Sequence, residues 1–307
     1  ECNGDPCAVS RALQSKNIFL KPFIIGIGLG KEFAASFACV GSYYDATDER
    51  RFKEVMGIVI SQALNNTSAQ VNLLDQSDKP VETNVSMSFY DQHSGALVYN
   101  YVHTMNTKGV PDTLSLDPVH TYRVVAQTIP PRVKDSVSIT PGIHNVIALK
   151  TPQGELEFKM GGVNPKSDEI PVIVRHADEM KTLHVQKFGD KTKYITGKYD
   201  LEILTLPRTY VNAVDISQSH TTTIEIPQPG LVSFSATSKG FGTVYQYKGD
   251  ELIKVCNLSE NKEKEILELQ PGEYLAVFRP KQARESIFTV ERKFKVTSGT
   301  SVVVKFN

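Results

Sequence analysis

Residues 154–158 read Gly-Glu-Leu-Glu-Phe and residues 230–234 read Gly-Leu-Val-Ser-Phe, and this repeated phrase decides how the second half of the chain folds. In both copies apolar residues alternate with other residues, which is the pattern of a strand with one buried face. The phrase returns after about 75–80 residues, and a fixed period of this kind indicates tandem copies of one structural unit.

A second phrase follows at nearly the same distance in each copy. It reads Gly-Lys-Tyr at residues 197–199 and Gly-Glu-Tyr at residues 272–274. We expect the glycine to take a turn conformation and the tyrosine to begin a strand with its ring buried and its hydroxyl at the rim. The two phrases together predict two β-sandwiches, at residues 151–227 and 228–307.

Residues 67–150 alternate in the same way, and turn signals such as Ser77-Asp-Lys-Pro80 separate short runs rich in β-branched and aromatic residues. The predicted strands are 71–73, 85–89, 97–101, 113–116, 122–125, 137–139 and 146–149. About seven strands over some eighty residues predict a further β-sandwich. Its order of turns and strands is similar to that of the prealbumin-like carboxypeptidase regulatory domain.

Residues 1–66 have helical periodicity instead. Asp5-Pro6 predicts the start of a helix, because Asp accepts from exposed amides and Pro at the first helical position loses no donor that the helix needs. Phe23–Leu29 is a nearly continuous apolar run, typical of a strand covered on both faces. A second helix is predicted from Thr47 or Asp48 to about Asn65. The segment therefore reads as part of a doubly wound α/β domain, in which ligands bind at the carboxyl ends of the central strands.

The run Glu1-Cys-Asn-Gly-Asp-Pro-Cys7, the helix after it, Ile24–Gly28 and Phe37–Val40 together resemble bacterial von Willebrand factor A domains. The resemblance covers residues 1–64 and is to the exported group labelled calcium-activated chloride channel homologues. It implies a divalent cation such as Mg²⁺, held by an Asp-x-Ser-x-Ser strand end, a Thr and an Asp that have no counterparts in this sequence. We therefore expect residues 1–66 to be the carboxyl-terminal half of such a domain, with no cofactor or metal on this chain.

The four cysteines are Cys2, Cys7, Cys39 and Cys256. Doubly wound topology would place Cys2 and Cys7 at the same edge of the sheet and Cys39, at the end of a returning helix, at the opposite edge. We predict a Cys2–Cys7 disulfide, with two free thiols as the open alternative. A disulfide would imply an oxidising compartment such as a periplasm or the cell exterior.

Composition excludes several classes of function. Lys and Arg total 34, as do Asp and Glu, so no basic footprint for nucleic acid is present. No apolar run has the length of a membrane-spanning segment. The 40% apolar and 22% charged residues indicate an ordered globular chain rather than a disordered one.

We predict no catalytic residue. Arg175-His176-Ala-Asp178 could be an acid–base cluster, but neighbours on a strand point to opposite faces, so a surface turn is favoured. His176 and His184 could offer two imidazoles to a metal but lack a third ligand. Asp5 is assigned to the helix cap. Finally, the three glycines of Gly26-x-Gly-x-Gly30 lack the spacing of a dinucleotide-binding loop.

The sequence thus predicts a non-enzymatic extracytoplasmic scaffold, periplasmic or on the cell surface, that binds a protein partner and carries a β-sandwich stalk. The alternative is a glycan-binding accessory module of a polysaccharide system or hydrolase. The chain has no Trp, so a glycan platform would depend on Tyr and Phe residues such as Tyr43, Tyr44 or Phe241. This alternative predicts an exposed row of aromatic side chains on one sheet face.

Overall fold

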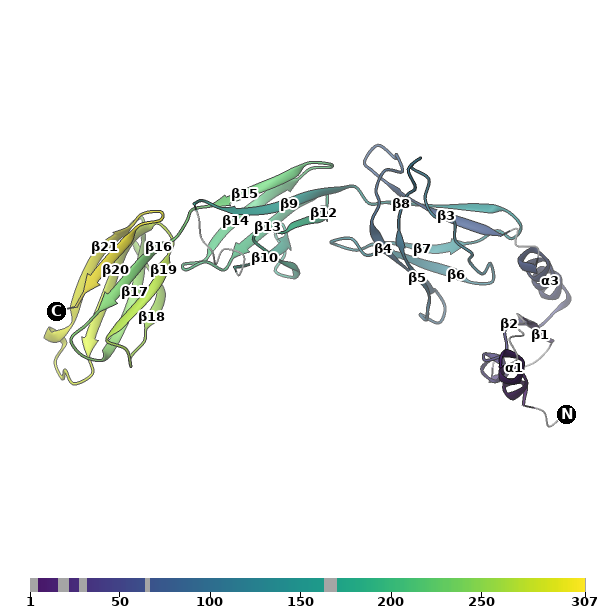
Figure 1. The fold of residues 1–307 in the computed structure, drawn as a ribbon, viewed down its shortest axis with the longest axis horizontal. Coiled ribbons are helices and arrows are strands. Elements are labelled where there is room, and N and C mark those ends of the chain that lie inside the picture. The colour runs from purple at the N-terminus through teal and green to yellow at the C-terminus, as the bar shows by residue number, and fades with distance from the viewer. Residues whose placement is uncertain (1–4, 16–21, 28–31, 64–66, 163–169, 307) are drawn as a thin grey trace. The chain divides into compact units, whose positions relative to one another are not determined.

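The computed structural model describes residues 5–15, 22–27, 32–63, 67–162 and 170–306. The chain divides into two compact units, Glu1–Thr151 and Pro152–Asn307. β-structure predominates, and the described α-helices lie in the first unit (Figure 1). None of the helices in the described part of the chain is long and apolar enough to cross a membrane.

The first unit begins with a short α/β segment. Its elements are α1 (Pro6–Gln14), β1 (Phe23–Ile27), α2 (Glu32–Phe37), β2 (Ser42–Ala46) and α3 (Glu49–Ala63). β1 and β2 pair in parallel, as a crossover through a helix requires. Asp5 accepts from the N–H groups of Cys7 and Ala8 at 2.8 and 3.1 Å, and Asp48 accepts from that of Arg51 at 2.8 Å. Both predicted helix starts are confirmed, whereas Leu29 and Asn65 lie outside the described residues.

The core of this segment is small and includes a residue from outside it. Tyr44, Val55 and Ile58 are buried together, and Val119, which lies well beyond α3 in the sequence, packs against them. The α/β segment is therefore covered in part by the β-region that follows it, rather than closing a core of its own.

The predicted Cys2–Cys7 disulfide is corrected by the structure, in which Cys7 is bonded to Cys39 with Cα atoms 5.6 Å apart. Cys2 lies outside the described residues. The prediction assumed that a full-length helix carries Cys39 to the far edge of the sheet. Instead α2 ends at Phe37, and the sulfurs of both cysteines lie near the carbonyl oxygen of Ser36, at 3.8 and 4.0 Å. The start of α1 thus lies against the end of α2.

The rest of the first unit is a β-sandwich. Its strands are β3 (Ser68–Leu74), β4 (Val85–Asp91), β5 (Leu97–His103), β6 (Thr121–Ala126), β7 (Arg132–Ser138) and β8 (His144–Lys150). They form an antiparallel sheet in the order β5-β4-β6-β7 and a parallel pair β3-β8. Val71 and Ile147 from the pair and Phe89 and Tyr122 from the larger sheet belong to one buried cluster.

The strand predicted at residues 113–116 is reduced to a single bridge between Leu114 and Ala69. Leu114 and Leu116 are buried as a strand there would require. Pro111 and Pro118 flank them, and proline lacks the backbone donor that a longer ladder needs.

The second unit contains two further sandwiches. The second sandwich of the chain consists of β9 (Gln153–Met160), β10 (Pro171–His176), β11 (Thr182–Lys187), β12 (Lys191–Ile195), β13 (Gly197–Ile203), β14 (Thr209–Ile216) and β15 (Thr221–Ile226). The third sandwich consists of β16 (Gly230–Ser235), β17 (Gly240–Lys248), β18 (Glu251–Leu258), β19 (Lys264–Leu269), β20 (Gly272–Pro280), a 3₁₀ turn η2 (Ser286–Phe288), β21 (Val290–Val296) and β22 (Ser301–Lys305).

The second and third sandwiches have the same strand order, and the first differs from them in that the strand flanking β3 opposite β8 in its smaller sheet is reduced to the Leu114 bridge. The sheets are β12-β9-β15 and β11-β10-β13-β14 in the second sandwich, and β19-β16-β22 and β18-β17-β20-β21 in the third. In each sandwich, including the first, the first strand pairs in parallel with the last. Phe158 lies opposite Ile224 and Phe234 opposite Val304, so the repeated phrase occupies equivalent strands.

A bulge in the first hairpin marks the same point in all three copies. The register shifts after Phe89 in the first sandwich, after Val174 in the second and after Val244 in the third. Each of these residues is fully buried. The structural repeat therefore extends to the first sandwich, where the sequence phrases did not reveal it.

Candidate functional site

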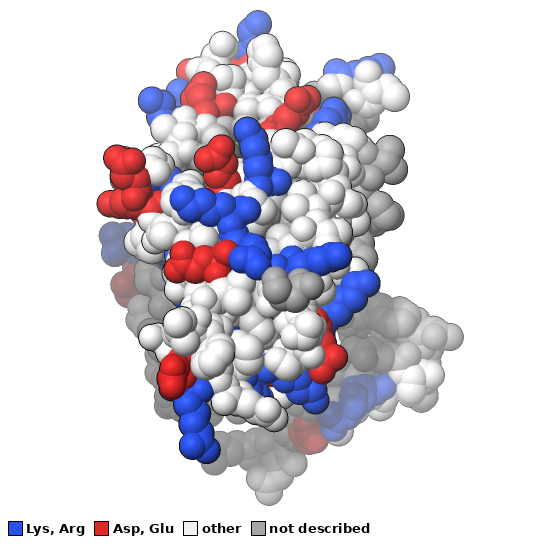
Figure 2. Space-filling view, turned by 90° about the vertical axis from the view of Figure 1, so that its left-hand side faces the viewer, with Lys and Arg blue, Asp and Glu red and all other residues white. Residues whose placement is uncertain are grey.

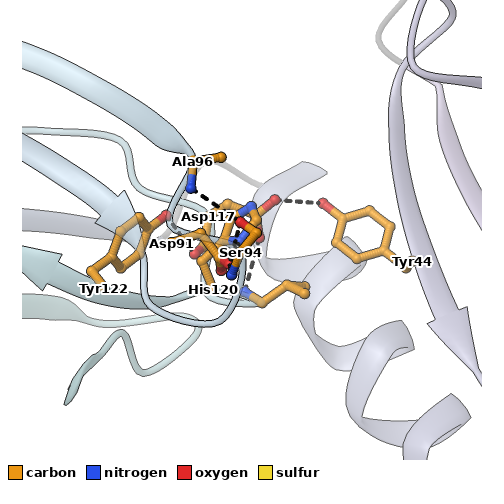
Figure 3. A network of polar contacts seen from close by, with 8 residues as sticks. Tyr44, Asp91, Ser94, Ala96, Asp117, His120 and Tyr122 are labelled. Atoms are coloured by element: carbon orange, nitrogen blue, oxygen red, sulfur yellow. Dashed lines mark hydrogen bonds and ion pairs between the residues drawn. The ribbon is translucent and has the colours of Figure 1, made fainter. Parts of the chain in front are cut away.

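A polar cluster lies at the end of the first sandwich that contacts the α/β segment (Figure 3). Asp91 ends β4, and its Oδ1 accepts from the N–H and the hydroxyl of Ser94, both at 2.7 Å. Its Oδ2 lies 2.9 Å from Nδ1 of His120. The pKa of Asp91 lies well below its ordinary value, chiefly because of the hydrogen bonds from Ser94 and to a smaller extent because of His120.

Ser94, Asp91 and His120 are the residue types of a serine hydrolase, but their connections differ. A nucleophilic serine donates to the histidine, while the acid holds the other ring nitrogen. Here the Ser94 hydroxyl donates to the carboxylate, so the imidazole does not take its proton. The cluster instead stabilises the turn between β4 and β5, where the Gly95 N–H also donates to the Asp91 carbonyl.

Asp117 joins the α/β segment to the first sandwich (Figure 3). Its Oδ2 accepts from the Tyr44 hydroxyl at 3.2 Å and its Oδ1 from the Val119 N–H at 2.9 Å. Its backbone carbonyl accepts from the Tyr122 hydroxyl at 2.8 Å, and burial raises the pKa of Tyr122. These bonds give Asp117 a structural role.

Two of the hollows in the described part of the first unit lie beside charged side chains. The larger, about 640 Å³, opens on the outer face of the four-stranded sheet and contains an ion pair between Arg123 and Asp135 at 3.5 Å. Both side chains are more than half exposed, so the pair contributes little to stability. The smaller, about 320 Å³, lies at the carboxyl ends of β1 and β2, where doubly wound sheets bind ligands. Asp48 and Glu49 line it, which disfavours an anion there.

The residues considered for chemistry in the sequence are separated by the structure. Arg175 donates to Glu202 at 2.7 Å, whereas the His176 ring stacks on Tyr199 at 5.2 Å. The prediction that Arg175 and His176 face opposite sides is confirmed. The His184 ring packs beside Tyr194 at 6.1 Å. Among the residues described, no three His, Cys, Asp or Glu side chains are grouped to hold a metal ion.

Glu202 is the centre of a charge network on the outer face of the second sandwich. It lies on β13 with its side chain 8% exposed, and Arg175 and Arg208 donate to its two oxygens at 2.7 and 2.6 Å. The hydrogen bond from Arg175 is the main reason that the pKa of Glu202 is lowered. The sequence did not reveal this network, because Arg175 and Glu202 are 27 residues apart on neighbouring strands.

The outer face of the third sandwich carries an aromatic row instead. Gly240, Gly242 and Val244 of β17 are buried, whereas Phe241 is 58% exposed and Tyr245 and Tyr247 are half-buried on the opposite side. The sequence had singled out only Phe241, and the period of two along the strand was the signal for the other two rings.

The two other aromatic residues considered as a platform do not serve as one. The Tyr44 ring is buried, and the Tyr43 hydroxyl is shielded from solvent.

Comparison with known proteins yields no family model that matches the chain and no curated protein that matches its sequence. Among solved structures, the chain is similar to the Bacillus anthracis TIE protein, with 15% identity, a TM-score of 0.22 and coverage of 78% of this chain and 50% of that one. It is also similar to the minor pilin of Streptococcus agalactiae, with 12% identity, a TM-score of 0.25 and coverage of 52% of this chain and 94% of that one. For the major pilin subunit of Bacillus cereus the identity is 10% and the TM-score 0.21, with coverage of 78% of this chain and 99% of that one.

The chain thus spans half the length of the TIE protein. TM-scores this far below 0.5 carry no inference about function. These similarities are distant, and they give the resemblance to von Willebrand factor A domains no support.

Proposed function

We propose that this protein is a non-enzymatic, extracytoplasmic scaffold whose β-sandwiches form a stalk and offer binding faces to a protein partner. The observation that carries the proposal is that three sandwiches with differing outer faces repeat the order of the four-stranded sheet and the parallel pairing of first and last strands. We propose a division into an α/β segment at residues 1–66 and sandwiches at 67–150, 151–227 and 228–307. A repeated module extends a chain and multiplies its surface without needing a reactive centre.

The disulfide between Cys7 and Cys39 supports a location in the periplasm or at the cell surface, since such bonds persist in oxidising compartments. Their separation of 32 residues closes a loop large enough for a stabilisation of about 3–4 kcal/mol. Intact-mass measurement of the purified protein with and without reductant should show the gain of two hydrogens for this bond. A protein from native cells with both thiols free would contradict the location.

The scaffold role is tested on intact cells. A membrane-impermeant, amine-reactive cross-linker should modify exposed lysines of the sandwiches, such as Lys191 and Lys254, and join them to a second protein. Mass spectrometry identifies the joined peptides. Lysines that stay unreactive even after the outer envelope is opened, and react only when the cytoplasm is released, would contradict an extracytoplasmic location. Cross-links confined to this chain would contradict a partner.

A second candidate, a glycan-binding accessory module, is favoured by the aromatic row of β17, because an exposed row on one sheet face is the feature that this function predicts.

We also propose a family origin for each of the first two parts of the chain, residues 1–66 and residues 67–150. A von Willebrand factor A-like origin of residues 1–66 is supported by the parallel pair β1-β2 with α2 between its strands. A carboxypeptidase-regulatory-like origin of residues 67–150 is supported by the antiparallel four-stranded sheet facing a parallel pair.

A further inference from the structure

We propose that the outer face of the sheet β18-β17-β20-β21 in the third sandwich binds an acidic polysaccharide. The inference deepens the glycan-binding candidate and names both the face and the class of ligand. It does not depend on the protein partner, so its failure would leave the scaffold proposal standing.

The aromatic row follows from the regular register of β17. Its pairing with β20 runs without a break from Gly240 opposite Pro280 to Gln246 opposite Tyr274. Alternate residues therefore share a face, and Phe241, Tyr245 and Tyr247 point away from the core. At about 3.3 Å per residue, the rings stand roughly 13 and 7 Å apart along the strand. The row thus presents an extended track rather than a single anchor point.

Lysines flank this track on both sides. Lys254 of β18 lies directly opposite Tyr245, and Lys293 of β21 lies opposite Leu275, the other partner of Tyr245. These residues form one row across four strands, with an ammonium group at each end. The Lys293 Nζ also lies 5.6 Å from the centre of the Tyr247 ring.

A third lysine lies beside Phe241, the first ring of the row, because the Lys281 Nζ is 5.6 Å from the centre of that ring. Each end of the aromatic row therefore has a cation beside a ring, but Lys281 is also paired with Glu260 at 3.1 Å, so the charge available to a ligand comes from Lys254 and Lys293.

The face carries an excess of positive charge. The strand register places four cationic and two acidic side chains on this outer face. The cationic ones are Lys254, Arg279, Lys293 and Lys295, and the acidic ones are Glu273 and Glu291. Lys295 approaches Glu273 only at 4.0 Å, and within the described chain no carboxylate pairs with Lys254 or Lys293. Figure 2 shows one side of the chain, with Lys and Arg side chains gathered across the middle of the view and Asp and Glu side chains beside them.

Rings beside cations fit a sugar polymer that bears carboxylates. The negative face of an aromatic ring attracts the C–H groups of a pyranose, while a neighbouring ammonium group binds the carboxylate. An acidic peptide added as a strand would pair at the edges β18 or β21 and would leave the aromatic row uncovered, because that row lies on the central strand β17. The whole chain is neutral, so this local excess is a property of the face.

The test measures binding of the full chain to polygalacturonate, with dextran as a neutral polymer and polyglutamate as an acidic peptide. We expect Lys254→Glu/Lys293→Glu to raise the dissociation constant for polygalacturonate at least tenfold, and Lys254→Gln/Lys293→Gln to raise it less. Lys191→Glu/Lys198→Glu, the same charge change at exposed sites of the second sandwich, should change it less than twofold.

A second pair of substitutions separates sugar recognition from simple charge attraction. Phe241→Ala/Tyr247→Ala should weaken polygalacturonate binding at least threefold and leave any polyglutamate binding unchanged. The proposal is overturned if the unaltered chain does not bind polygalacturonate, or if it binds dextran as tightly. Equal losses in the control pair of lysines, or no loss on removing the rings, would also overturn it.

Discussion

The second and third sandwiches share their inner architecture and differ on their outer faces. In both, a fully buried tyrosine donates its hydroxyl to a backbone carbonyl four residues earlier, Tyr199 to Ile195 and Tyr274 to Gln270, each at 2.6 Å. Both also place a bulge after the same core valine. The inner residues thus hold one framework constant.

The outer faces diverge at two equivalent positions. Arg175 follows the bulge in the second sandwich and Tyr245 follows it in the third, while Glu202 and Val277 each lie three residues after the buried tyrosine. A charge network in one copy is therefore an aromatic and aliphatic surface in the other. The comparison teaches that binding properties can change on the outer face while the core stays fixed.

The largest expected effect tests whether the inner framework is equivalent. Tyr199→Ala and Tyr274→Ala should each destabilise their own sandwich by about 3–5 kcal/mol, because each leaves a large cavity. Tyr→Phe at either site should cost about 1 kcal/mol through the lost hydrogen bond. Hydrogen exchange, resolved by sandwich, measures the opening free energies.

Met180→Ala is the control, since that side chain is 88% exposed and should change stability by no more than about 0.5 kcal/mol. A small cost at one tyrosine and a large cost at the other would break the equivalence of the two frameworks.

The next effect concerns the outer face of the second sandwich. Glu202→Val alone should cost about 2–4 kcal/mol, because Arg175, only 17% exposed, loses its carboxylate. Arg175→Tyr/Glu202→Val copies the third sandwich and should recover most of that loss, since an apolar pair can replace a buried ion pair. Urea unfolding followed by sandwich-resolved exchange measures both. A double variant no more stable than the single one would show that the two faces are not interchangeable.

The alternation of apolar residues was enough to predict the sandwiches and the burial of Tyr199 and Tyr274, because a period of two needs no knowledge of pairing. The sequence could not show that Arg175 meets Glu202 or that Tyr245 lies between two lysines, since both depend on strand register. It also failed for Cys7 and Cys39, where the length of α2 decides which edge the second cysteine reaches.

The acid sensitivity of the two sandwiches should also differ. The pKa of Glu202 is lowered, chiefly by its hydrogen bond from Arg175, and that of Asp200 by backbone N–H groups of Ala213 and Asp178. The unfolded chain therefore takes up these protons first as the pH falls, starting near the ordinary carboxyl pKa of about 4. Their stabilisation is present above that range and is lost as the pH falls through the lowered pKa values.

Exchange measured from pH 7 to pH 3 should show the second sandwich losing more stability than the third, where Leu275 and Val277 occupy the positions of Asp200 and Glu202. Asp200→Asn/Glu202→Gln should flatten the profile of the second sandwich. Parallel losses in both sandwiches, unaffected by these substitutions, would contradict the assignment.

The smallest effect sharpens a difference in the backbone. Ala213 has a positive φ of 55° at a bulge between β13 and β14, and its N–H donates to Asp200 at 2.8 Å. The pairing of β20 with β21 in the third sandwich has no such bulge. A left-handed conformation costs an L-residue about 1–2 kcal/mol, and glycine removes this strain. Against this gain, glycine loses more conformational entropy on folding than alanine, which costs about 0.5–1 kcal/mol. Ala213→Gly should therefore stabilise the second sandwich by about 0.5 kcal/mol.

The matched variant is Ser136→Gly in the first sandwich, because Ser136 has a φ of 58° at the corresponding bulge between β6 and β7. Its N–H is likewise bonded to the Gln92 side chain, and glycine keeps this donor but loses the exposed hydroxyl that accepts from Gln92 Nε2 at 3.2 Å, so its gain should be the smaller of the two. Both substitutions should raise the midpoint of thermal unfolding of their own sandwich by a few degrees. A loss of stability in both would mean that the surrounding hydrogen bonds, rather than the residue at the bulge, already remove the strain.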